Sequence, residues 1–198
     1  MHRLVKVGLM TVVLLAACTP QDDPTLPIAS PNPKPGASVS AQLSPPQGSS
    51  GCPTQEGGVE THSYLTEVRV AGQNGFDRVV FQFQAAKDVP PGVPKYALSQ
   101  VAPPFTKDPS AEPMEVEGSE FFQIIFHGGS GVDFSGEDYR QTYTGPKEIK
   151  PDLDLVAELT EQGDFEATLS WILGLQRPSC PSLKTLKDPL RLVIDLPH

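Results

Sequence analysis

The sequence from residue 65 to residue 84 decides the fold of this chain, and it reads LTEVRVAGQNGFDRVVFQFQ. In its first half, Val68 and Val70 alternate with charged residues, and in its second half apolar residues recur from Val79 at every second position. A period of two is typical of a half-buried β-strand. The Asn-Gly pair between the two runs tolerates positive φ, so the stretch predicts a tight β-hairpin with one face in a hydrophobic core.

Strand patterns continue through the rest of the chain. Segments rich in β-branched or aromatic residues, bounded by Gly, Pro or Asp, occur at residues 65–71, 78–84, 96–101, 121–126, 155–160, 165–173, 183–186 and 190–196. Gln162-Gly163-Asp164 separates two of them and predicts a second hairpin turn. Strands of this length and spacing favour a sandwich or a barrel, and we expect a single all-β sandwich domain over residues 57–198.

The N-terminus carries the pattern of an export signal. Arg3 and Lys6 precede an apolar run over residues 7–17 that is too short to span a bilayer as a stable helix. The run ends in Leu-Ala-Ala-Cys, which resembles a bacterial lipobox. We therefore expect a signal peptide over residues 1–17, lipidation of Cys18 and anchoring to a bacterial membrane, inner or outer. A secreted protein without an anchor is the alternative.

Residues 18–56 are expected to form the lipidated terminus and a linker. Eight prolines lie among Ser, Gln and Gly between residues 19 and 51, and this stretch contains no aromatic residue. Such a segment cannot bury enough apolar surface to offset the entropy of ordering it. It predicts a disordered, extended Pro/Ser-rich tether that holds the domain away from the membrane.

Two cysteines remain when Cys18 is set aside, and they are Cys52 and Cys180. An even number of cysteines in an exported chain predicts a disulfide, because extracytoplasmic compartments are oxidising. Two free thiols are the alternative. A bridge between these positions would close a very long loop and would strongly restrict the unfolded chain.

The net charge of the chain is −9, and loss of Arg3 and Lys6 with the signal would make the mature protein still more acidic. An acidic surface does not release counterions from a polyphosphate, so nucleic acid is not expected as a partner. The same sign gives no attraction to anionic lipid headgroups beyond the acyl anchor. Neutral glycans, cationic groups and other proteins remain as possible partners.

Several segments, taken in order, resemble one protein family. They are residues 75–83, the tetrapeptide Tyr-Thr-Gly-Pro at 143–146, residues 163–166, Trp171 with Gly174-Leu175, and residues 188–195. Together they are similar to the AMIN-like domains of bacterial envelope lipoproteins. The resemblance implies a compact β-sandwich. Through the related AMIN domains of cell-wall amidases and secretins, it also implies binding to peptidoglycan or localisation at the envelope.

No residue pattern in the chain fits a catalytic centre. The mature chain contains three widely separated histidines, which are His62, His127 and His198. They lack the paired His-Glu motif of a zinc hydrolase. Residues 128–132, GGSGV, lack the final glycine of a serine nucleophile elbow and read as a flexible loop. With a catalytic domain not expected after residue 198, we expect no enzymatic activity, no cofactor and no metal.

Residues 128–146 form a long connection rich in Gly, Ser and acids, which predicts either a functional or a poorly ordered loop. Its acids Asp133, Glu137 and Asp138 predict a solvated acidic loop. A glycosidase-like carboxylate pair and a calcium loop are the alternatives, and the EF-hand pattern fails because its glycine and its final acid are out of register. Glycan contact needs aromatic faces beside hydrogen-bonding groups. The candidate ligand-binding residues are therefore Phe134, Tyr139, Arg140 and Tyr143.

Two further positions carry structural expectations. Trp171 stands in an apolar strand and is expected in the core. Arg78 and Asp195 fall on the polar sides of their strands and are expected to form a cross-strand ion pair. Taken together, the sequence predicts a non-catalytic envelope module that contacts peptidoglycan or another envelope component. The alternative is an assembly factor that binds a protein such as a secretin or a wall hydrolase.

Overall fold

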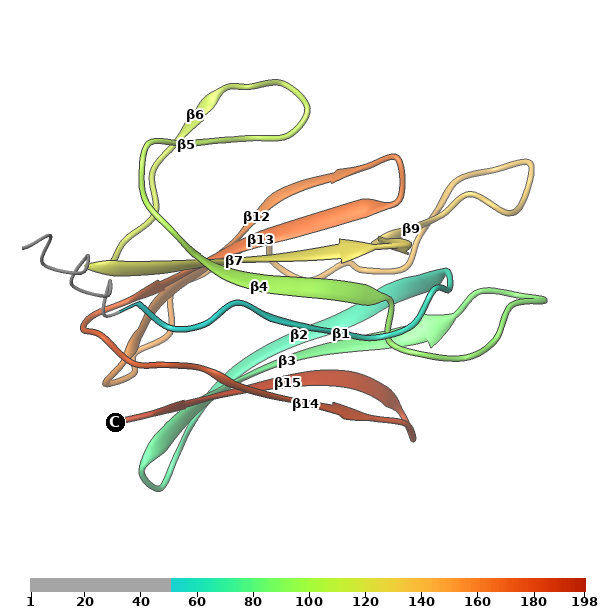
Figure 1. Ribbon diagram of the computed structural model, residues 1–198. Coiled ribbons are helices and arrows are strands. Elements are labelled where there is room, and N and C mark those ends of the chain that lie inside the picture. Colours follow the sequence, from blue (N-terminus) through green and yellow to red (C-terminus); the bar gives the residue numbers. More distant parts are fainter. Residues whose placement is uncertain (1–50) are drawn as a thin grey trace, which may run out of the picture. The chain divides into compact units, whose positions relative to one another are not determined.

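Two β-sheets packed face to face make up the body of the molecule in the computed structural model, which describes residues 51–198 (Figure 1). Within these residues every regular element is a strand, which confirms the predicted all-β fold. The predicted signal segment, Cys18 and most of the predicted tether lie outside the described residues. Between residues 51 and 198, no helix is long and apolar enough to span a membrane.

The first sheet has six strands, and each pairs antiparallel with its neighbour. In spatial order they are β1 (Gln55–Gly57), β4 (Lys95–Val101), β7 (Glu120–His127), β13 (Thr168–Leu175), β12 (Val156–Phe165) and β11 (Glu148–Ile149). The folded part therefore begins earlier than the predicted boundary at residue 57. Residues 52–56, which were expected in the linker, include most of β1 and one end of the disulfide.

The second sheet has five strands. In spatial order they are β14 (Ser182–Leu186), β15 (Leu190–Pro197), β3 (Phe76–Ala85), β2 (Ser63–Gln73) and β8 (Gly129–Ser130). The predicted hairpin between β2 and β3 is confirmed, and Gly75 in its two-residue turn has a φ of 85°. Only Gly adopts such a φ without steric cost, which explains why this dipeptide turns the chain.

The second predicted hairpin forms, but its turn lies elsewhere. Phe165 pairs with Thr168, so the turn consists of Glu166 and Ala167, which have φ values of 48° and 58°. The predicted turn at residues 162–164 is wrong, because those residues continue β12 through an irregular register. Gly163 serves a different purpose there: a Cβ at this position would lie 2.6 Å from the Cβ of Asp108, so a side chain has no room.

Two small hairpins extend from the body. β5 (Phe105–Thr106) pairs with β6 (Pro113–Met114), and this hairpin packs Phe105 and Met114 against Ile172 on the outer face of the six-stranded sheet. The other hairpin pairs β9 (Val132–Asp133) with β10 (Arg140–Gln141). Since β8, β9 and β10 all lie within residues 128–146, the long connection between the main strands is built from short ordered strands.

Aromatic rings from both sheets meet in the main core. Phe81 of the five-stranded sheet contacts Phe126 and Trp171 of the six-stranded sheet edge-to-face, with centroid distances of 5.2 and 5.8 Å. Edge-to-face pairs contribute about 0.5–1.5 kcal/mol beyond the burial of their area. Trp171 is fully buried, which confirms its predicted place in the core.

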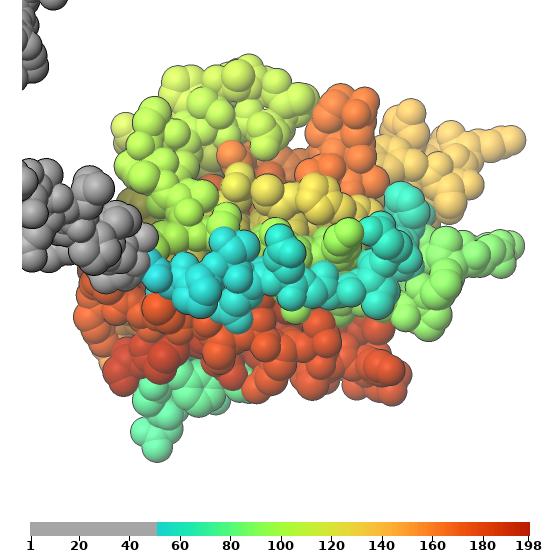
Figure 2. Space-filling model, viewed as in Figure 1, coloured from blue at the N-terminus to red at the C-terminus, as the bar shows by residue number. Residues whose placement is uncertain are grey.

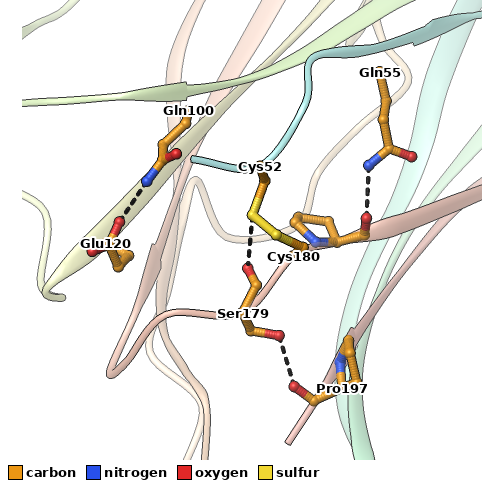
Figure 3. Close-up of a disulfide and its surroundings, with 8 residues drawn as sticks. Cys52, Gln55, Gln100, Glu120, Ser179, Cys180 and Pro197 are labelled. Atoms are coloured by element: carbon orange, nitrogen blue, oxygen red, sulfur yellow. Dashed lines mark hydrogen bonds between the residues drawn. A yellow bond between two sulfur atoms is a disulfide. The ribbon is translucent and has the colours of Figure 1, made fainter. Parts of the chain in front are cut away.

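The predicted Cys52–Cys180 disulfide is present, with a sequence separation of 128 residues. It joins the chain just before β1 to the chain just before β14, which are outer strands of different sheets (Figure 3). Beside it, the Gln55 side-chain amide donates a hydrogen bond of 2.6 Å to the carbonyl of Pro181. The disulfide therefore fastens the two sheets to each other along one side of the sandwich.

A buried carboxylate fastens the sheets at a second place. Asp77 of β3 is almost completely buried, and its Oδ2 accepts hydrogen bonds from the backbone N–H groups of Leu155 and Val156, at 3.0 and 2.9 Å. These groups lie where the chain enters β12. Because unpaired buried N–H groups are costly, this aspartate holds the start of β12 against the five-stranded sheet.

Candidate functional site

The β9–β10 loop, residues 132–141, stands out from the sandwich and is the candidate functional site (Figures 1 and 2). Two aromatic side chains lie in it, and we call Phe134 and Tyr139 the aromatic tip. They are 55% and 78% exposed, although large apolar side chains usually lie inside a fold. Their rings meet edge-to-face with centroids 5.1 Å apart, and more than half of each side chain stays exposed to solvent.

Asp133 organises this loop from its base. Its carboxylate accepts hydrogen bonds from the backbone N–H of Ser135 at 3.0 Å, from the Ser135 hydroxyl at 2.6 Å and from the Arg140 guanidinium at 2.8 Å. The guanidinium, followed by the two Ser135 donors, holds the pKa of Asp133 far below its usual range. The carboxylate is therefore ionised at neutral pH, and it ties both ends of the loop together.

Arg140 contacts Asp133 through both its backbone and its side chain. Its backbone is opposite Asp133 in the β9–β10 pair, and its guanidinium donates a hydrogen bond to the Asp133 carboxylate. Most of the side chain remains in solvent. The arginine predicted as a ligand contact thus first of all fixes the loop that presents the aromatic tip.

The root of the loop is bonded to β12. Asp164 accepts hydrogen bonds from the backbone N–H of Gly131 at 2.7 Å and from the hydroxyl of Ser130 at 3.1 Å. Ser130 is buried in β8, which pairs parallel with the start of β2. The expectation of a flexible loop at residues 128–132 is therefore wrong, because backbone pairing and a carboxylate both restrain it.

Tyr143 lies in the core and not on the surface. It is 5% exposed, its ring meets Trp171 edge-to-face at 5.9 Å, and its hydroxyl donates a hydrogen bond of 2.6 Å to the carbonyl of Pro146. Burial, with a smaller effect of Glu161, raises the pKa of Tyr143 to about 12. The prediction that this ring faces a ligand is wrong, because the chain turns back into the sandwich after β10.

The structure adds Tyr64 to the site, a residue that the sequence patterns did not single out. Tyr64 of β2 lies beside Asp133, and burial together with this carboxylate raises the pKa of Tyr64. Its sequence position carries no signal of this neighbour, because the contact joins β2 to a loop far along the chain. Tyr64 therefore forms a half-buried wall at the base of the loop.

The other residues considered in the sequence take separate places. Glu137 and Asp138 are exposed within the β9–β10 loop. His62 and His127 border a surface hollow, whereas His198 lies 3.4 Å from the carboxylate of Asp77. Among the described residues, no three His, Cys, Asp or Glu side chains lie close enough together to hold a metal ion.

The predicted ion pair between Arg78 and Asp195 is confirmed. Two parallel hydrogen bonds of 2.6 and 2.9 Å join the guanidinium to the carboxylate across β3 and β15. Lys184 of β14 reaches the same carboxylate at 3.0 Å. The Arg78 bonds, with a smaller effect of Lys184, lower the pKa of Asp195. This cluster lies on the outer face of the five-stranded sheet, away from the aromatic tip.

Two β-sheets that pack face to face and are joined by a disulfide define an all-β domain of the kind that folds in an oxidising compartment. Residues 63–198 match the family model of the AMIN-like domain, and the chain belongs to this family. Comparisons with curated proteins and with solved structures gave no match. The family and the disulfide together indicate an extracytoplasmic protein of the cell envelope.

Proposed function

We propose that this chain is a non-catalytic, lipid-anchored module of the bacterial cell envelope, and that its aromatic tip contacts the glycan of peptidoglycan. The observation that carries the proposal is the exposed pair of Phe134 and Tyr139 on a hydrogen-bonded hairpin. Sugar rings bind flat aromatic faces through their C–H groups, and neighbouring polar groups fix the orientation. The tip combines both chemistries on one protruding loop.

The rigidity of the loop supports this role. Ser135 and Arg140 both donate hydrogen bonds to Asp133, and at the root of the loop the backbone N–H of Gly131 donates to Asp164. A contact surface that is already ordered loses little conformational entropy on binding. The exposed rings of Phe134 and Tyr139 can therefore bind a glycan with little cost of ordering. Several anchored copies of the chain would bind the same repeating polymer, so that their weak contacts add up.

The anchor and the tether supply the remaining part of the proposal. Lipidation of Cys18 would leave the chain attached to a membrane, because two or three acyl chains hold a protein almost permanently. A proline-rich tether extends by up to about 3.1 Å per residue, so it reaches tens of ångströms from the bilayer. The folded domain would then reach the wall polymer and would act by binding it, without catalysing a reaction.

A sedimentation assay with isolated sacculi tests the proposal. The chain from residue 19 onward, with its disulfide intact, is expected to sediment with sacculi, and the double variant F134A/Y139A is expected to lose at least about tenfold in retention. F165A is the matched control, because Phe165 is 50% exposed at the end of β12 and outside the tip. Equal retention of the wild type and the double variant, or no retention of either, would contradict the proposal.

A further inference from the structure

Within residues 51–198, one side of β2 lacks a partner strand over most of its length. β2 pairs with β3 from Ser63 to Gln73, but in this part of the chain its other side is paired at Ser63 and Tyr64 alone, with β8. Among the described residues, no other segment gives a backbone hydrogen bond to residues 65–73. The β2–β3 hairpin also projects beyond the body at its turn (Figures 1 and 2). An edge of this kind is a template for another strand.

The two-residue turn determines which groups face this open edge. Gln73 and Phe76 flank the turn directly, so they form a hydrogen-bonded pair. Successive residues of an antiparallel strand alternate between facing the partner and facing away. Val68, Val70 and Gly72 therefore turn their N–H and C=O groups outward, away from β3.

The charges beside Val68 are arranged for pairing with an identical strand. Glu67 and Arg69 flank it on the outer face of the sheet, and both side chains are 43% exposed. In the single chain these two side chains bond each other at 2.5 Å. When two copies of the triplet Glu-Val-Arg pair antiparallel with Val68 opposite Val68, Glu67 of each copy lies opposite Arg69 of the other.

We propose that two copies of this chain pair antiparallel through their β2 edges, with a two-fold axis at Val68. The Val68 residues exchange both backbone hydrogen bonds across the axis. Glu67 of each copy then lies opposite Arg69 of the other, at the non-hydrogen-bonded positions where side chains approach most closely. The two five-stranded sheets become one continuous sheet, and the interface is the same patch on both copies.

The same charges exclude the neighbouring registers. Moving the axis by one residue in either direction places Arg69 opposite Arg69, or Glu67 opposite Glu67. Like charges directly opposite each other destabilise a strand pair. An axis at Val70 leaves both charges without an opposite charge, so only the register centred on Val68 gains two ion pairs.

The outer face of the five-stranded sheet lacks the strong negative charge of the whole chain, so two copies that meet beside it do not bring two acidic surfaces together. The chain has a net charge of −9, yet the outer face of the five-stranded sheet carries two acidic residues, Glu67 and Asp195, and four basic ones. The basic residues are Arg69, Arg78, Lys184 and Arg191. The register shift between Leu65 and Glu67 bends the strand, so the paired segment is short and the dimer is weak.

Sedimentation velocity across a concentration series tests the pairing. The chain from residue 19 onward is expected to dimerise reversibly below about 1 mM. E67R and R69E are each expected to weaken the dimer by at least about tenfold, since each turns two attractive pairs into repulsive ones. The double variant E67R/R69E restores opposite charges and is expected to dimerise like the wild type.

K184E is the matched control, because it reverses one basic charge on the same sheet but at the opposite edge strand. It is expected to leave the dimer unchanged, and circular dichroism verifies that each variant is folded. A wild type that stays monomeric to about 1 mM overturns the proposal. Equal weakening by K184E and R69E overturns it as well, as does a folded double variant that fails to regain the dimer. Sacculus retention is measured separately, so the outcome is independent of the proposed glycan contact.

Discussion

The same types of aromatic side chain occupy two contrasting places in this molecule. Phe81, Phe126 and Trp171 are fully buried between the sheets, whereas Phe134 and Tyr139 project from the β9–β10 loop into solvent. Both groups pair edge-to-face at similar distances. The difference shows that ring pairing alone does not define a role: rings held between two sheets stabilise the fold, and rings held on a bonded loop are available for contact.

Truncation of aromatic rings is expected to affect stability very differently in the two places. W171A is expected to lower the free energy of unfolding by about 3–5 kcal/mol, because it leaves a large cavity between the sheets. F134A/Y139A is expected to stay within about 0.5 kcal/mol of the wild type, since more than half of each side chain is exposed to solvent. Urea denaturation with the disulfide intact measures both. Similar losses for the two variants would show that the tip is part of the core.

Removal of the disulfide is expected to destabilise the body of the molecule but to leave the β9–β10 loop ordered. The bridge closes a separation of 128 residues, so C52S/C180S is expected to lose about 2–4 kcal/mol through greater freedom of the unfolded chain. The β9–β10 loop has its own bonds and is expected to keep its NMR shifts in the folded variant. Chemical denaturation and a heteronuclear spectrum give the two readouts. Shift changes concentrated in the loop would contradict its local ordering.

Loss of an aspartate is expected to cost more stability in the body of the molecule than in the β9–β10 loop. D77A leaves the N–H groups of Leu155 and Val156 without an acceptor in a buried place, and a loss of about 2 kcal/mol is expected. D133A removes bonds from Ser135 and Arg140, which are near in sequence and reach water in its absence. Its unfolding midpoint is expected to match that of the wild type. The prediction fails if D133A destabilises the fold as much as D77A does.

The smallest expected loss of stability in the body of the molecule lies on its outer face and depends on pH. The pKa of folded Asp195 lies below its ordinary value of 3.8, so its stabilising contribution is complete above that pH and is lost as the pH falls through the folded pKa. D195N is therefore expected to be less stable than the wild type at pH 7 by up to about 1 kcal/mol. Urea unfolding from pH 7 to pH 2 should show this difference shrinking below about pH 4. If the difference in unfolding free energy between the wild type and D195N stays constant down to pH 2, the effect comes from side-chain packing and not from the charge of Asp195.

Much of the fold could be predicted from local pattern. Each of the eight predicted strand segments overlaps a strand of the main sheets, and the Asn-Gly hairpin lies where its φ preference requires. The second turn was misplaced because Gly163 resembles a turn signal, while its small size in fact accommodates Asp108. The two-residue strands, such as β5 and β9, have too few residues for any period to appear.

The candidate site could be predicted only in part. An aromatic pair within an acidic loop pointed to Phe134 and Tyr139, and both are exposed. Nothing in the local sequence distinguished Tyr143, whose ring packs on Trp171. Tyr64 was missed for the converse reason, since its neighbour Asp133 comes from a distant part of the chain.

The strands, the first hairpin and the disulfide partners follow from the sequence, because alternation, turn dipeptides and cysteine number are local or countable properties. The family followed from the order of several short segments. The packing of the two sheets was needed to show that the Tyr143 ring is covered and that one edge of β2 stays open. Burial and edge exposure depend on segments that are far apart along the chain and meet only when the two sheets pack.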